Sequence, residues 1–200
     1  MKTKTVFTIS IILSILLFLF HWYLWDIIDL VTPFLILVPI IIILVFVAFV
    51  LIYTIVYAAK EIKALKLRAC IPLLIIVLSI MFNLLVPFTK ANLDFNFKLN
   101  INARNKVVEL IENGELKPEE TNENMIALPS KYKRLSKGDG EVMIDCFDNH
   151  NAYIFFTYRG IIDNYSGFVY DSDEAALQEL SREYFEVEKL CDSWYYCASR

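Results

Sequence analysis

The residues with the clearest potential for metal chemistry are Asp145, Asp148 and His150, which lie close together in the chain. Carboxylate oxygens and an imidazole nitrogen are ligands suited to Mn²⁺ or Zn²⁺. However, Asp148 and His150 belong to the segment 148–151, whose Asp and Asn residues favour a turn closed by local hydrogen bonds. The pattern therefore favours a solvated turn, and we expect no metal ion and no other cofactor.

Ser166, His150 and Asp163 have the residue types of a hydrolytic triad. No nucleophile-elbow pattern surrounds Ser166, and a Ser166-Gly167 pair inside a strand is more typical of a bulge or of close packing. We therefore assign no catalytic residue.

Arg159 and Asp163 flank a tight turn in a segment that also contains Tyr165. The two charged residues can form a structural ion pair, or Arg159 can bind an anionic ligand. We prefer the ion pair, and we keep Arg159, Asp163 and Tyr165 as candidate contacts for a ligand or partner.

Three other residues of this segment are expected to shape the turn: Gly160, Asn164 and Gly167. Glycine accepts backbone conformations and close approaches that a side chain would prevent, and asparagine is common in turns. A valine at Gly160 or Gly167 should therefore lower accumulation of the protein.

The elements that hold these residues follow a long apolar region. Up to residue 89, three uncharged stretches predict membrane-spanning helices at about 6–25, 32–58 and 70–88. The segment Asp26–Asp29 is expected to be a short loop between the first two. No Asp, Glu, Lys or Arg lies within the three predicted spans, which lowers the case for a transporter.

Charge indicates how this region is oriented. Basic residues flank the predicted spans on one side, at Lys2, Lys4 and 60–68, whereas Asp26 and Asp29 lie on the other side. Basic loops remain in the cytoplasm. We therefore predict a multi-pass protein with its N-terminus inside and its C-terminal domain outside.

The part of the chain after residue 89 is acidic, with 13 Lys and Arg against 20 Asp and Glu. An acidic domain argues against nucleic acid as a partner, because phosphates require a basic surface. It also argues against adsorption to anionic lipid headgroups.

We predict a membrane-proximal helix and linker at 90–124, followed by a small α+β domain with an antiparallel sheet at 125–200. Apolar residues alternate from Leu93 to Ile101, which is a strand signal, but a helix is favoured there. A short helix should begin near Asp171, where Asp171 and Glu174 resemble a capping box. Strands are expected at 141–147, 152–158, 165–170, 185–190 and 194–197.

The four cysteines carry a redox prediction. Cys70 should remain reduced at the cytoplasmic side, and Cys146 should be buried as a small apolar residue. Cys191 and Cys197 bracket the turn of the last hairpin, and we predict a disulfide between them, which requires that turn to be longer than two residues or bulged.

The stretch Phe155-Phe-Thr-Tyr-Arg-Gly160, followed by 163–170, resembles a family of uncharacterised bacterial membrane proteins. The Leu-Pro-x-x-Tyr segment at 128–132 and the pair Trp194-Tyr195 belong to the same pattern, and the resemblance covers roughly residues 80 to 200. It implies a hydrophobic N-terminal region, an extracytoplasmic domain and a location in the bacterial cytoplasmic (inner) membrane. It implies no activity.

We therefore expect a non-enzymatic envelope protein that is embedded in the lipid bilayer and binds a partner, such as another envelope protein. One alternative is an envelope enzyme or small-ligand binder that uses the region 159–163. Another is an immunity protein that blocks a toxin in the membrane, whose gene would lie beside a toxin gene.

Overall fold

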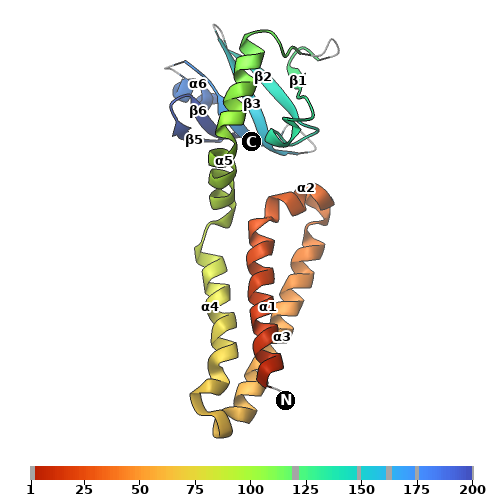
Figure 1. The fold of residues 1–200 in the computed structure, drawn as a ribbon, viewed down its shortest axis with the longest axis vertical. Helices are drawn as coiled ribbons and strands as arrows, with labels where there is room; N and C mark the ends of the chain where they lie inside the picture. The colour runs from red at the N-terminus through yellow and green to blue at the C-terminus, as the bar shows by residue number, and fades with distance from the viewer. Residues whose placement is uncertain (1–2, 119–121, 148–149, 161–163, 174–175, 200) are drawn as a thin grey trace. The chain divides into compact units, whose positions relative to one another are not determined.

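The structure is a computed structural model that describes residues 3–118, 122–147, 150–160, 164–173 and 176–199 (Figure 1). The chain divides into two compact units, Met1–Asn92 and Leu93–Arg200. The boundary lies within helix α5 (Phe88–Glu112).

The first unit is helical. Its elements are α1 (Thr3–Trp22), α2 (Leu24–Leu35), α3 (Leu37–Leu65), the 3₁₀ segment η1 (Lys66–Cys70) and α4 (Ile71–Leu85). Helix α1 packs against both α3 and α4, with a core of Leu13, Leu17, Val50 and Ile76. Two helical stretches are long and apolar enough to cross a membrane by length and composition, Thr3–Trp22 and Leu37–Leu85.

Several boundaries in this unit differ from the sequence prediction: the helix predicted at 6–25 is Thr3–Trp22, and the helix predicted at 32–58 is Leu37–Leu65. The predicted loop Asp26–Asp29 is part of α2. Asp26 lies in the first turn of this helix, where a carboxylate interacts favourably with the helix dipole. The helix predicted at 70–88 ends at Leu85, because Val86 precedes Pro87 and is extended (φ −90°, ψ 123°).

The second unit contains a six-stranded antiparallel sheet with the order β1-β2-β3-β4-β6-β5. The strands are β1 (Met125–Ala127), β2 (Glu141–Phe147), β3 (His150–Arg159), β4 (Tyr165–Tyr170), β5 (Glu186–Cys191) and β6 (Trp194–Ala198), and α6 (Ala176–Glu183) lies between β4 and β5 in the chain. The predicted antiparallel sheet and the hairpin around Asp192-Ser193 are therefore confirmed. The turn predicted at 148–151 is shorter, because His150 and Asn151 belong to β3.

Each face of the sheet has its own core. Phe97, Val107, Val108 and Ile111 of α5 pack on one face, against side chains that include Phe155. Leu180 of α6 and Tyr184 cover the other face, against residues that include Ile154 and Cys197. Strand β3 is buried on both faces, as its continuous apolar run predicts.

The ambiguous segment 93–101 is helical, as favoured. Leu93, Phe97 and Ile101 face the core at helical spacing, whereas Phe95 and Leu99 are exposed. Apolar residues occupy every second position from Leu93 to Ile101, which resembles a strand. Leu93, Phe97 and Ile101 are also four positions apart, however, so they lie on one face of a helix.

Gly167 lies where β4 approaches β3 closely. A Cβ atom at Gly167 would lie 2.8 Å from the backbone oxygen of Phe155 and 2.8 Å from Ile154 Cγ2. The register of β3 shifts between Phe156 and Tyr158, so the irregularity lies in β3 opposite this glycine. The predicted close packing at Gly167 is confirmed.

Candidate functional site

Arg159, at the end of β3, forms an ion pair with Glu141. Its Nη1 lies 2.6 Å from Glu141 Oε2, and its guanidinium lies over the Phe156 ring at 5.3 Å from the centroid. Asp163, the predicted partner, lies outside the described residues. The loop closes through the Gly160 amide, which donates to the Asn164 carbonyl at 2.7 Å.

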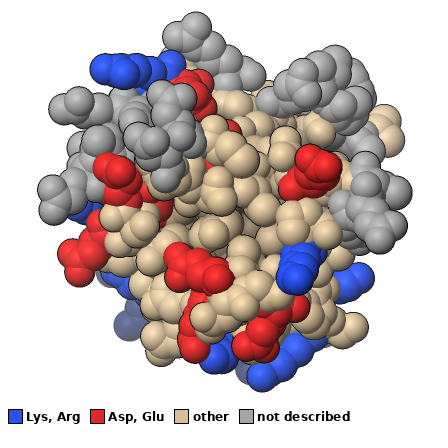
Figure 2. All heavy atoms as spheres, turned by 90° about the horizontal axis from the view of Figure 1, so that it is seen from above, with Lys and Arg blue, Asp and Glu red and all other residues tan. Residues whose placement is uncertain are grey.

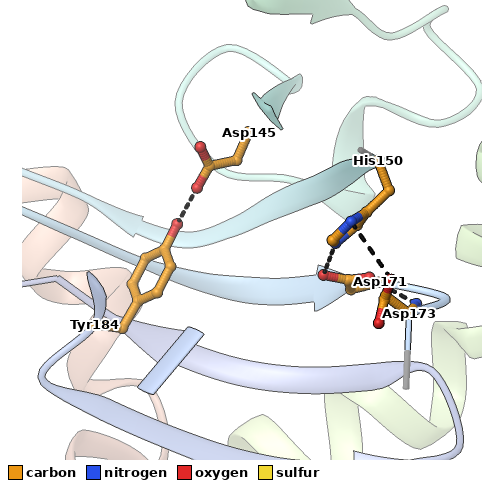
Figure 3. Close-up of polar contacts among 5 residues, drawn as sticks. All are labelled: Asp145, His150, Asp171, Asp173 and Tyr184. Carbon is orange, nitrogen blue, oxygen red and sulfur yellow. Dashed lines mark hydrogen bonds and ion pairs between the residues drawn. The ribbon is translucent and has the colours of Figure 1, made fainter. Parts of the chain in front are cut away.

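Tyr165 belongs to a chain of hydrogen bonds on the α6 side of the sheet. Tyr184 donates to Asp145 Oδ2 at 2.9 Å, as Figure 3 shows, and the hydroxyls of Tyr165 and Tyr184 lie 3.0 Å apart. Because the Tyr184 proton points to Asp145, Tyr165 acts as the donor to Tyr184. Burial raises the pKa of the Tyr184 phenol strongly, so this hydroxyl remains protonated and acts as a donor.

His150 faces two carboxylates at the start of β3 (Figure 3). Its Nε2 lies 3.0 Å from Oδ2 of the buried Asp171, and its Nδ1 lies 3.7 Å from Asp173 Oδ2. Asp171 also accepts the Asp173 amide at 2.9 Å. Asp171 therefore fastens the end of β4 to β3. Glu174, its predicted capping-box partner, lies outside the described residues.

The candidate metal ligands and triad residues that the structure describes contact other partners. Asp145 is bound to Tyr184, and the hydroxyls of Ser166 and Thr157 lie 2.9 Å apart. His150 is bound to Asp171 instead. Asp148, the remaining candidate ligand, lies outside the described residues, and within those residues no group of three or more potential ligands could hold a metal ion.

The predicted disulfide is not present in the structure, in which Cys191 and Cys197 are both free thiols. Cys191 pairs with Trp194, whose side chain packs on the α5 side, whereas Cys197 is buried on the α6 side. The two thiols therefore lie on opposite faces of the sheet. Cys146 is exposed, not buried as predicted, because it lies near the end of β2 opposite Asn151.

We expect mass spectrometry of the protein purified without a reductant to find no bond between Cys191 and Cys197. In the folded protein, a maleimide should label Cys191 and Cys146 but not Cys197. Burial and neighbouring carboxylates raise the pKa of the Cys197 thiol to about 12, which suppresses its thiolate. Unfolding should make Cys197 reactive, and a bond between Cys191 and Cys197 would contradict the β5–β6 register.

A recess of about 480 Å³ lies between α5 and the end of the β5–β6 hairpin. This volume is within the usual range for ligand sites. Its polar and aromatic lining comes from α5, from the end of β4 and from the hairpin turn: Asn105, Glu109, Glu112, Tyr170, Asp192 and Trp194. We refer to this site as the α5–hairpin recess.

A hydrogen bond holds the two walls of the recess together. The Trp194 indole Nε1 donates to Asn105 Oδ1 at 2.9 Å, and the Trp194 ring packs edge-on against Tyr170 with centroids 5.3 Å apart. Trp194 is only 3% exposed. The position of this ring is therefore fixed before any partner binds.

The carboxylates of Glu109, Glu112 and Asp192 place acidic groups around the recess. Burial raises the pKa of the Tyr170 phenol, and the nearby Glu112 raises it further. Burial and Asp192 likewise raise the pKa of the Cys191 thiol. Figure 2 shows Asp and Glu side chains, together with Lys and Arg side chains, around a largely uncharged middle on the face that it presents.

The α5–hairpin recess was not predicted from the sequence. Asn105 and Trp194 are 89 positions apart, and nothing in either local pattern indicates that they meet. One signal was present: Asn105, Glu109 and Glu112 share a helix face with the apolar residues Ile101 and Val108. A polar stripe that interrupts the buried side of a helix often marks the edge of a site.

With this geometry in hand, comparison with protein-family models, with curated proteins and with solved structures found no match.

Proposed function

We propose that this chain is an integral membrane protein of the bacterial cytoplasmic membrane, with three membrane-spanning helices and an outside domain that binds a partner. The two long apolar helical stretches support a membrane location. The longer stretch contains α3, η1 and α4, and its turn at 66–70 would separate two spans. The basic residues near this turn and near the N-terminus support placing both inside.

This topology predicts the result of reporter fusions. A reporter that is active only outside the cytoplasm should give signal when fused at Arg200 and none when fused after Leu65. A cytoplasmic reporter at the same positions is the matched control and should give the opposite result. If the first reporter is active after Leu65 and silent at Arg200, the proposed orientation is wrong.

The α5–hairpin recess carries the proposal that the outside domain binds a partner. The recess combines ligand-sized volume, a partly exposed Tyr170 ring held by Trp194, and exposed charged groups. Elsewhere in the described part of the domain, side chains that could take part in catalysis are held in internal contacts, as for Arg159 with Glu141 and His150 with Asp171. Groups held in this way support the fold, which favours binding over catalysis.

Site-specific cross-linking tests this function. A photo-reactive amino acid at Ser193, which lines the recess, should give a discrete cross-linked product in cells that make the protein. The same amino acid at Lys131, which is exposed and outside the recess, is the matched control and should give none. Equal products from both positions, or none from either, would contradict a binding role for the recess.

A further inference from the structure

The charged side chains that line the recess are all acidic. Glu109 and Glu112 lie about one helical turn apart on α5, and Asp192 comes from the β5–β6 turn. A group bound in the recess would therefore have carboxylates from two separate elements beside it. Such an arrangement lowers the energy of a cation and raises that of an anion.

A partly exposed aromatic ring favours the same kind of ligand. Tyr170 lines the recess beside these carboxylates, whereas Trp194 is only 3% exposed, packs edge-on against the Tyr170 ring and is fixed by its hydrogen bond to Asn105. Aromatic faces attract ammonium and guanidinium groups through the ring quadrupole. A site that joins aromatic rings to carboxylates can bind both the charge and the apolar stem of a basic side chain.

One wall of the recess already binds a cation from the protein itself. Lys106 Nζ lies 2.9 Å from Glu109 Oε2, and both side chains are at least half exposed. An exposed pair of this kind is weak, so an incoming cation can replace it. Glu112 and Asp192 have no ion-pair partner among the residues that the structure describes.

We infer that the α5–hairpin recess holds a positively charged ammonium or guanidinium group, presented by a basic segment of the partner. This inference rests on the proposed binding function and names the chemistry of the bound group. A free polyamine has the same chemistry, and competition with spermidine separates the two sources.

The test uses the full chain in nanodiscs of zwitterionic lipid and a fluorescent tri-lysine peptide, followed by fluorescence anisotropy. We expect tri-lysine to bind and tri-glutamate not to bind, with weaker tri-lysine binding at high salt. Glu112→Gln should weaken binding by about tenfold, as expected when one charge-assisted hydrogen bond is lost. Glu115→Gln removes the same charge outside the recess lining and should change binding by less than about twofold.

The native cysteines locate the bound peptide. Alkylation of Cys191, which lines the recess, should block tri-lysine binding. In the variant Cys191→Ser, alkylation of the exposed Cys146 should leave binding intact. Binding that survives alkylation of Cys191 would place the cation elsewhere and overturn the inference.

The outcomes distinguish the inference from the function on which it rests. If Ser193 cross-links a partner but tri-lysine and tri-glutamate bind equally or not at all, the cation inference is overturned and the binding function stands. If Ser193 also gives no cross-link, both are overturned. If spermidine displaces tri-lysine at equal concentration, the bound cation is a polyamine. The inference that a basic segment of the partner supplies the cation is then overturned.

Discussion

Replacing Gly167 by valine is expected to destabilise the C-terminal sheet domain by more than about 3 kcal/mol, because no side chain fits between β4 and β3. Even the first added carbon would lie 2.8 Å from the backbone oxygen of Phe155. That oxygen belongs to a central strand paired on both sides, so it cannot move without breaking the sheet. Thermal unfolding of the purified protein should show a fall in Tm of more than about 10 °C.

Gly114 provides the control for this substitution. It has φ of +72°, and a Cβ atom there would meet only Lys117 Cε, at 3.8 Å. Gly114→Ala should therefore cost only the backbone strain, about 1 kcal/mol. If Gly167→Val is no more harmful than Gly114→Ala but abolishes cross-linking from Ser193, Gly167 serves binding and our assignment of a packing role is wrong.

The sequence was sufficient for the elements whose signals are local. The apolar run of β3 indicated a strand buried on both faces, and the Asp192-Ser193 turn indicated the last hairpin. Pro87 could have indicated the end of α4, since the residue before proline avoids helical geometry. Asp26 was misread because a carboxylate near a helix start resembles a loop residue when only charge is considered.

The candidate site could not be predicted in the same way, because its residues come together only through packing. The alternation from Leu93 to Ile101 fits both a strand and a helix, and only contact with the sheet decides between them. The Cys191–Cys197 pairing failed for a related reason. Residues close in a hairpin can point to opposite faces, and the pairing register that decides this depends on the bulge between Lys189 and Cys191.

Arg104 is the clearest example of a residue whose type misleads. An arginine on a helix is normally exposed, yet this side chain is 2% exposed and lies between α5 and the sheet. Its Nη2 donates to Asn96 Oδ1 at 2.7 Å and to the Leu135 carbonyl at 3.3 Å, and its guanidinium lies over Phe168 at 4.4 Å from the ring centroid. The Nε atom is buried and has no hydrogen-bond partner among the residues that the structure describes.

Burial lowers the pKa of the Arg104 guanidinium to about 10, so the folded domain holds this proton less tightly than the unfolded chain does. At neutral pH the buried charge by itself therefore opposes folding, and the hydrogen bonds and the Phe168 contact must compensate for it. Removing the whole side chain and removing only the charge should consequently have different effects.

We expect Arg104→Ala to destabilise the domain by about 4 kcal/mol, because it leaves a cavity and removes the partner of Asn96 Oδ1 and the Leu135 carbonyl. Arg104→Met fills most of the space, keeps a contact with Phe168 and removes the buried charge, so its cost should be below about 2 kcal/mol. Denaturant unfolding followed by the fluorescence of Trp194, which packs in the same core, measures both changes in stability.

The control is Lys106→Ala, which removes an exposed cation two residues further along α5 and should cause no resolvable change in stability. If Arg104→Met is as harmful as Arg104→Ala, the polar contacts of the guanidinium, and not its volume, hold α5 to the sheet.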